Sequence, residues 1–514
     1  MTKQLYKSTA IVSGMTLISR VMGFVRDMLI ANLFGVSPAT DAFFVAFKIP
    51  NFLRRLFAEG AFAHAFVPVL SDYKHNGSKA DLKSFIEKTA GTLAGLLGLI
   101  TLAGVIAAPL LIIFFAPGFL WEGSQYDLAV QLVQITFPYL LFISLTAFAG
   151  SILNAHGMFA IPAITPIFLN ICMIVTAIWL APVFAEPIVA LAWGVFIAGV
   201  VQLLFQLPVL FRLGVLSRLR WGWRDSGVRR VIKLMLPAIF GVSVVQINLL
   251  FGTLMASFLA SGSVSWLYYS DRLVEFPLGI LGVAVSSVIL PNLAKNYAAE
   301  DTMAFSKSLD WGLKLVILIG MPATLGLVLL SQPLLATLFQ YNEFGADDVA
   351  MAGKSLMAFA LGLLAFVLIK VLVPAFTSRM DTRTPVRFGL YAIVCNMVLS
   401  IALVFPLAHA GIALATSLAA YLNAGLLLIN LLKQQVYQPG DGWWVFMLRV
   451  LFASCVMSIF LTYFVDQQLW LVWNVSQRGL HLVMVIGLSM LIYLIGLAVS
   501  GLRVRHLHEH EFRS

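Results

Sequence analysis

Ionisable side chains interrupt three long apolar stretches of this chain, and their chemical types suit the binding of an anion. The three stretches contain SRVMGFVRD, DAFFVAFKIPNFLRRLFAEGAF and WLYYSDRLVEFP. Their basic side chains are Arg20, Arg26, Lys48, Arg54, Arg55 and Arg272, and their acidic side chains are Asp27, Asp41, Glu59, Asp271 and Glu275. Five of the six basic residues are arginines. A planar guanidinium group can bind phosphate oxygens through two parallel hydrogen bonds, whereas a lysine ammonium acts as a point charge.

The composition places these residues in a membrane protein. Of the 514 residues, 61% are hydrophobic and 11% are charged, and the mean hydropathy is +0.95. A soluble domain usually has about 25% charged residues, and one with far fewer would expose large apolar patches and aggregate. The apolar runs are also too long for outer-membrane barrel strands, which have roughly 10 residues. We therefore predict an all-α polytopic membrane protein and exclude a soluble multi-domain enzyme.

The hydrophobic runs and the loop charges together predict about fourteen membrane-spanning helices. A span needs about 20 apolar residues. The expected spans are 8–35, 41–71, 82–113, 128–155, 160–182, 187–211, 231–258, 263–294, 308–331, 348–376, 385–406, 410–432, 443–465 and 479–501. With the N-terminus inside, the cytoplasmic loops hold most of the Lys and Arg, as the positive-inside rule requires. The loop 212–230 contains six arginines, whereas the outer loops GFLWEGSQYD and SQPLLATLFQYNEFGADD contain no Lys or Arg. Both termini are therefore expected in the cytoplasm.

A faint internal repeat predicts two six-helix lobes. FVPVLSDY resembles ILPNLAKN, and FAIPAITPIFLN resembles TRTPVRFGLYAIVCN. The matched prolines, Pro68 with Pro291 and Pro162 with Pro385, are both 223 residues apart. We predict lobes at 1–222 and 223–440, followed by two further helices and a cytoplasmic tail at 441–514. The alternative is a set of unrelated helices with ordinary prolines.

Two interpretations of the charges inside the spans remain open. An ionisable side chain at the bilayer centre costs roughly 2.5–3.5 kcal/mol on insertion scales. The charges must therefore pair with one another or line a water-filled cavity. In the first case Asp27, Asp41, Glu59, Asp271 and Glu275 neutralise the bases in structural ion pairs. In the second case the arginines bind an anion, and they come from both repeats, where transporters place their sites.

Other chemistries have little support in the sequence. No Walker A, HExxH or GxSxG context is present, so neither ATP-driven transport nor hydrolysis is expected. Cys172, Cys395 and Cys455 lie in apolar runs without metal-ligand spacing. The tail sequence HLHEHE is more typical of an exposed polar segment than of a metal site. The net charge of +10 is explained by Lys and Arg in cytoplasmic loops, so we expect no nucleic-acid partner. Because no motif or ligand spacing indicates a metal or another cofactor, we expect none.

The three charged stretches resemble the MurJ (MviN) family of bacterial lipid II flippases, within the multidrug/oligosaccharidyl-lipid/polysaccharide exporter superfamily. The similarity runs along essentially the whole chain. It implies a central cavity between two six-helix lobes, and a groove formed by the last two helices. It also implies essential cavity arginines at Arg20, Arg26, Arg54 and Arg272, with an important acidic position at Asp41. Some members have a sodium site between the seventh, eleventh and twelfth helices, but its ligands are not identified in this sequence.

The resemblance implies transport of lipid II, an undecaprenyl-pyrophosphate-linked precursor, to the periplasmic leaflet of the inner membrane for cell wall biogenesis. Alternating access without covalent chemistry is expected, so the protein is not expected to be an enzyme. The expected partners are lipid II and membrane lipids, with cell wall synthesis or division proteins as further candidates. The alternatives are a cation-coupled drug exporter of the same fold and a non-transporting scaffold for wall synthesis. Energy source, conformation and oligomeric state stay open.

Overall fold

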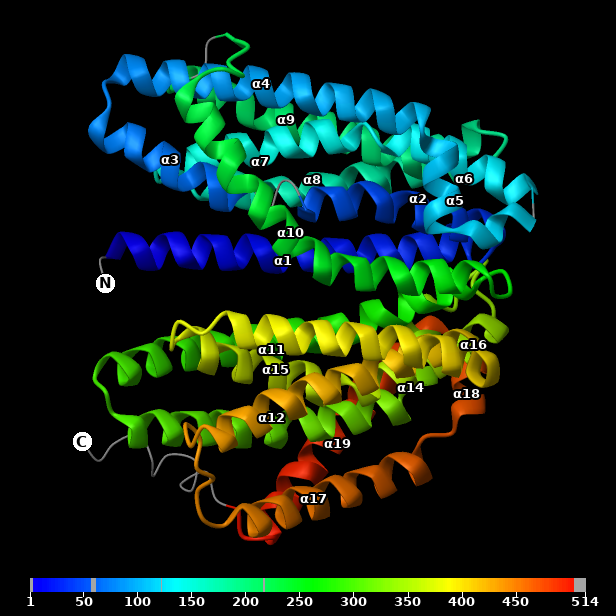
Figure 1. Ribbon diagram of the computed structural model, residues 1–514. Helices are drawn as coiled ribbons and strands as arrows, with labels where there is room; N and C mark the ends of the chain where they lie inside the picture. Colours follow the sequence, from blue (N-terminus) through cyan, green and yellow to red (C-terminus); the bar gives the residue numbers. More distant parts are fainter. Residues whose placement is uncertain (1–2, 57–61, 122, 216–217, 503–514) are drawn as a thin grey trace. The chain divides into compact units, whose positions relative to one another are not determined.

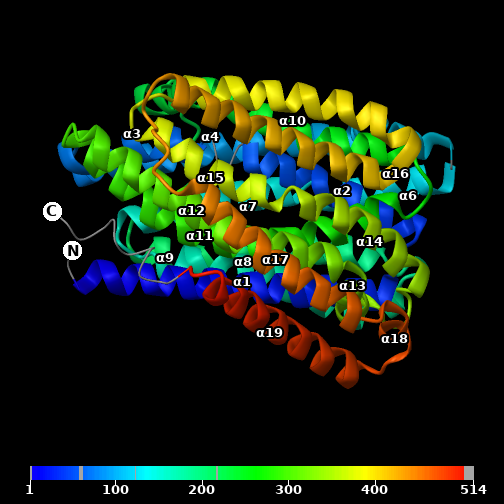
Figure 2. The same cartoon turned by 90° about the horizontal axis from the view of Figure 1, so that it is seen from below.

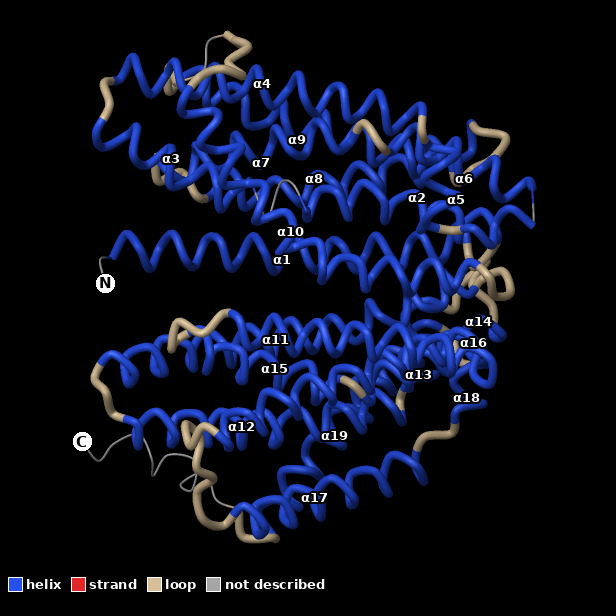
Figure 3. The backbone as a smooth tube through the Cα atoms, viewed as in Figure 1, coloured by secondary structure: helices blue, strands red, loops and turns tan. Residues whose placement is uncertain are grey.

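The computed structural model describes residues 3–56, 62–121, 123–215 and 218–502. Throughout this part of the chain the regular structure is helical, and no strand occurs in it (Figure 3). The predicted all-α class of a multi-pass membrane protein is confirmed. The predicted site residue Glu59 and the tail HLHEHE lie outside the described residues.

The chain divides into two compact units, Met1–Ser265 and Trp266–Ser514 (Figure 1). The first unit contains α1 (Lys3–Phe34), α2 (Pro38–Arg54), α3 (Ala63–Asn76), α4 (Lys79–Ile106), α5 (Ala108–Phe115), α6 (Gly123–Thr136), α7 (Tyr139–Ala155), α8 (Ala160–Val175), α9 (Val189–Arg212) and α10 (Ser226–Ser257). Helix α11 (Ser263–Ala298) begins at the end of this unit and continues into the second. The predicted lobes 1–222 and 223–440 stay a prediction.

The second unit ends with a pair of helices that pack on each other (Figure 2). Its elements after α11 are α12 (Thr302–Leu329), α13 (Ser331–Phe339), α14 (Ala346–Leu361), α15 (Leu363–Thr377), α16 (Arg383–Lys433), α17 (Trp443–Phe464), α18 (Gln467–Val472) and α19 (Val475–Val499). Helices α17 and α19 approach closely at Gly496, where a Cβ atom would lie 3.0 Å from Cα of Ala453. Small residues allow such close packing in membranes, where lipid is as apolar as the side chains.

Nine helical stretches among the described residues are long and apolar enough to cross a membrane. Helix α16 is one of them, although Ala408 breaks it with a φ of 48° and a ψ of −130°. This break falls between the predicted spans 385–406 and 410–432. Helices α1 and α11 have 32 and 36 residues and carry ionisable side chains. The total of fourteen spans stays a prediction.

Hydrogen bonds to side chains cap the N-termini of α2 and α4. Ser37 precedes α2, and its Oγ accepts a hydrogen bond from the backbone N–H of Thr40 at 3.2 Å. Pro38 follows in the first turn, where its missing N–H leaves no intrahelical bond unmade. Ser78 and Asp81 form a capping box at the start of α4, which satisfies two of the otherwise unpaired N–H groups of the first turn.

Candidate functional site

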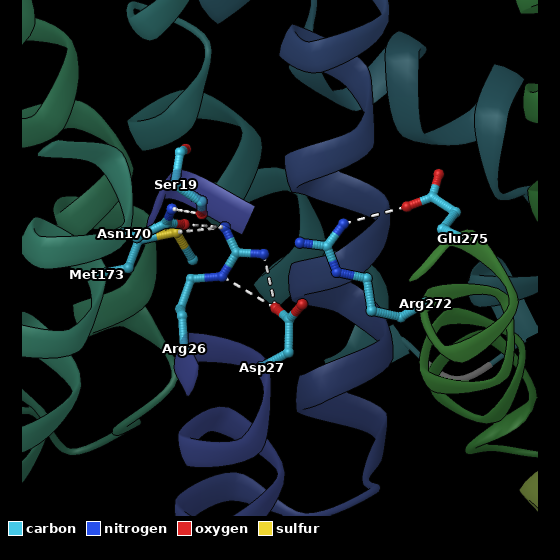
Figure 4. Close-up of polar contacts among 7 residues, drawn as sticks. All are labelled: Ser19, Arg26, Asp27, Asn170, Met173, Arg272 and Glu275. Atoms are coloured by element: carbon cyan, nitrogen blue, oxygen red, sulfur yellow. Dashed lines mark hydrogen bonds and ion pairs between the residues drawn. The ribbon is translucent and has the colours of Figure 1, made fainter. Parts of the chain in front are cut away.

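Arg26 and Asp27 form a buried ion pair on α1. The guanidinium Nη2 and Nε of Arg26 lie 2.6 Å and 2.9 Å from Oδ1 of Asp27 (Figure 4). Arg26 is 5% exposed and Asp27 is fully buried. Consecutive residues on a helix do not face each other, so the long arginine side chain must curl back to reach this carboxylate. The positive charge is therefore compensated where it is buried.

Helices α2 and α8 supply further contacts of Arg26. Its Nη1 donates to Oδ1 of Asn170 at 3.0 Å and lies 3.8 Å from Sδ of Met173. The ring of Phe47 on α2 lies under the guanidinium, with its centroid 6.0 Å from Cζ. Three helices thus hold the position of one arginine.

Asp41 caps the start of a distant helix. Its carboxylate, 2% exposed, accepts hydrogen bonds from the N–H of Gly262 at 2.7 Å, the N–H of Ser265 at 2.8 Å and the Oγ of Ser265 at 2.5 Å. These groups lie at the N-terminus of α11, where unpaired N–H groups and the helix dipole favour a negative charge. Asp41 therefore caps the first turn of α11 within the first unit.

Lys48 lies about two turns after Asp41 on α2 and contacts α10. Its Nζ donates to Oγ1 of Thr253 at 3.0 Å. Spacing by seven places Asp41, Lys48 and Arg55 on one stripe, yet their environments differ. Asp41 is buried, Lys48 is half-buried and Arg55 is exposed. The shared stripe therefore does not form a single charge cluster.

Arg54 lines a cavity of about 450 Å³ inside the first unit. Its Nε donates to Oδ1 of Asn51 at 3.2 Å. The polar side chains around the cavity come from α7, α8 and α9: Thr146, Ser151, Asn154, Thr165, Gln202 and Gln206. A cavity with one guanidinium and several neutral hydrogen-bonding groups suits a ligand that combines an anionic group with hydroxyls or amides.

Arg272 has a more open setting in the second unit. Its Nη1 lies 3.1 Å from Oε2 of Glu275, three residues along α11 (Figure 4). The side chains are 30% and 48% exposed. Asp271, the residue before Arg272, is exposed. In the first unit, Arg20 on α1 is exposed as well. In the structure, Asp27 forms an ion pair with Arg26, and Glu275 forms one with Arg272. The sequence alone did not determine this pairing.

Several polar residues of the site were missed by sequence reasoning. Asn170, Thr253 and Ser265 hold Arg26, Lys48 and Asp41 respectively. Asn170 and Thr253 lie in otherwise apolar runs, whereas Ser265 lies in the serine-rich stretch SGSVSW. Their signal was present, because an amide or hydroxyl inside a span usually hydrogen-bonds to another helix. Within the described ranges, no three His, Cys, Asp or Glu side chains gather as metal ligands would.

The comparisons with known proteins settle the family. The family model described as "Lipid II flippase MurJ" matches residues 30–480. A relative from Vibrio cholerae serotype O1, named "Probable lipid II flippase MurJ", is 47% identical and covers 98% of each chain. The chain belongs to the MurJ family.

Solved structures agree with this placement. A MurJ structure in an "inward closed conformation" is 27% identical, with a TM-score of 0.81 over 95% of this chain and 98% of that one. An inward-facing multidrug resistance MATE transporter has a TM-score of 0.65 over 83% and 98%, at 13% identity. The MATE similarity is one of fold alone. The MurJ similarity covers nearly the whole chain, and the family model includes Arg54 and Arg272 in the residues it matches.

Proposed function

We propose that this protein is a lipid II flippase of the bacterial inner membrane. It moves the undecaprenyl-pyrophosphate-linked peptidoglycan precursor from the cytoplasmic to the periplasmic leaflet. The observation that carries the proposal is membership of the MurJ family, whose relatives are named for this activity over nearly the full length of the chain. Arginines inside apolar helices supply the chemistry that such a substrate needs.

The pyrophosphate is the part of lipid II that cannot cross hydrocarbon unaided. Arginines would replace its water shell with charge-assisted hydrogen bonds. Arg54 already lines a cavity, and Arg272 is partly exposed. Arg26 is held by Asp27, so an anion must compete with this carboxylate or bind beside the pair. The exposed Arg20 and Arg55 would attract the anion from a distance.

Transport follows by alternating access, with the site open to one side of the membrane at a time. No bond is made or broken, so the protein acts as a transporter and not as an enzyme. The polyprenyl tail stays in lipid or in a groove of α17 and α19. Both termini face the cytoplasm. No cofactor is required, and a sodium ion would enter only as a coupling ion.

Depletion of the protein, followed by measurement of lipid II on each face of the inner membrane, tests the proposal. We expect lipid II to accumulate on the cytoplasmic face, and reintroduction of the wild-type chain to restore its sidedness. Unchanged sidedness after depletion, with defects only in the recruitment of wall-synthesis proteins, would establish a scaffold instead. Restored resistance to cationic drugs without any change in lipid II would establish a drug exporter.

A further inference from the structure

We infer that Asn170 of α8 is a positioning residue for Arg26, and that it sets the affinity of the site for the pyrophosphate. This inference rests on the proposed function, because it assigns a role in binding the same substrate. Asn170 is 5% exposed and lies in the apolar run AIPAITPIFLNICMIV of α8. A buried amide in such a run needs hydrogen-bond partners, and here both partners belong to α1.

The hydrogen bonds fix the orientation of the Asn170 amide. Its Nδ2 donates to the backbone carbonyl of Ser19 at 3.1 Å, and its Oδ1 accepts from Nη1 of Arg26 at 3.0 Å. A carbonyl oxygen can only accept and a guanidinium can only donate. Rotating the amide by 180° would therefore place like groups against each other at both ends. Only one orientation satisfies both contacts (Figure 4).

The two contacts tie the Arg26 side chain to the backbone of its own helix through α8. Ser19 lies two turns before Arg26 on α1, so the amide bridges the helix surface and the guanidinium. Nη1 is thereby directed to α8, while Nε and Nη2 are directed to Asp27. The neutral amide holds the guanidinium without adding a second negative charge. A carboxylate at this position would hold it too, but would repel an anionic substrate.

The charge substitution Asn170→Asp tests this role in the purified full-length protein. Farnesyl pyrophosphate serves as a soluble prenyl pyrophosphate probe. The new carboxylate can accept from Arg26, but it cannot donate to the Ser19 carbonyl and it makes the local charge more negative. We expect affinity for the probe to fall about tenfold or more, because the added negative charge repels the pyrophosphate and competes with it for Arg26. Wild-type affinity in this variant would overturn the inference.

A neutral substitution and a matched control separate binding from folding. Asn170→Leu keeps a similar volume and removes both hydrogen bonds without adding charge, and we expect about a three- to tenfold loss of affinity. Thr176→Val is the control, at the position that directly follows α8. Thr176 is also buried, and within the described residues its hydroxyl donates to the Cys172 and Met173 carbonyls of α8, not to α1. Equal losses of affinity in both variants would overturn the inference.

An exchange of the carboxylate distinguishes positioning from charge count. The double variant Asp27→Asn with Asn170→Asp keeps the local charge but draws the guanidinium toward α8. If position matters, affinity stays low in the double variant. If affinity returns to the wild-type value, charge count alone governs binding and Asn170 has no positioning role.

Measuring lipid II sidedness alongside probe binding distinguishes failure of the Asn170 role from failure of the proposed function. Wild-type protein that restores lipid II sidedness and binds the probe, together with Asn170 variants of normal affinity, would overturn the positioning role alone. Wild-type protein that neither restores sidedness nor binds the probe would overturn both.

Discussion

Arg26 and Arg272 are the same residue type in the same kind of apolar helix, yet they are held in opposite ways. Arg26 is nearly inaccessible, and residues from α1, α2 and α8 surround its guanidinium. Arg272 is 30% exposed and pairs with Glu275 on its own helix. A buried pair leaves an uncompensated charge when one partner is removed, whereas an exposed pair contributes little to stability. The two arginines should therefore fail differently when they are replaced.

The largest effect is expected for Arg26→Ala. The fully buried Asp27 carboxylate would lose the guanidinium that lies 2.6 Å from it, and removing one member of a buried ion pair destabilises a protein by about 3–5 kcal/mol. We expect a lower melting temperature in detergent, lower abundance and no restoration of lipid II sidedness. The double variant Arg26→Ala with Asp27→Asn should recover much of the melting temperature but none of the transport. Recovery of transport in the double variant would make the pair purely structural.

Arg272→Ala should separate transport from stability. Its pair with Glu275 is partly exposed, and such pairs contribute about 0–1 kcal/mol. We expect a melting temperature close to the wild-type value, normal abundance and loss of lipid II export. Glu275→Gln is the matched control, since it breaks the same pair and keeps the arginine. Export that survives in Arg272→Ala would remove the accessible arginine from the proposed site.

The membrane potential tests the net charge that these arginines carry. Each elementary charge crossing the membrane is worth about 2.3 kcal/mol per 100 mV, so a pyrophosphate of about −2 is driven outward by up to roughly 4–5 kcal/mol. Arginines that accompany the anion reduce this value. The Arg26–Asp27 pair, being compensated, adds no net charge.

We therefore expect collapse of the potential, at fixed pH and sodium, to slow lipid II export in cells. Export that continues unchanged after collapse, and stops only when the sodium or proton gradient is removed, would establish ion coupling in place of this mechanism.

The sequence predicted the charges of the site and the class of the fold, but not the pairing. A sequence shows directly which charged residues lie inside apolar runs and which arginines lie in loops. These two local properties were enough to predict the fold class and the charged residues of the site. The contacts of Asp41 with Ser265 and of Arg26 with Asn170 join positions 224 and 144 residues apart. A lone Asn in an apolar run, such as Asn170, indicates that a partner exists without identifying it. Only the packing of α8 on α1 places Asn170 beside Arg26.

The partly buried ion pair Lys88–Asp225 is expected to contribute less to stability than the buried Arg26–Asp27 pair. Lys88 Nζ lies 2.7 Å from Oδ2 of Asp225, and the two side chains are 34% and 19% exposed. Partial burial raises the pKa of Asp225. The Lys88 ammonium and the N–H groups of Gly227 and Val228 lower it more, so the pKa lies below its ordinary value of 3.8. Asp225 precedes α10 in the arginine-rich loop.

The direction of this pKa shift fixes the pH dependence of stability. A carboxylate whose pKa is lower in the folded state stabilises the protein above the ordinary pKa, and this contribution is lost as the pH falls through the folded value. We expect the wild-type melting temperature to fall more steeply than that of Asp225→Asn as the pH drops from about 5 to about 3. The difference should be small, because pairs of this kind contribute about 1 kcal/mol or less. Parallel curves for the two proteins would show that the Lys88–Asp225 contact adds nothing to the stability of the fold. The contrast with the buried Arg26–Asp27 pair would then be larger than we expect.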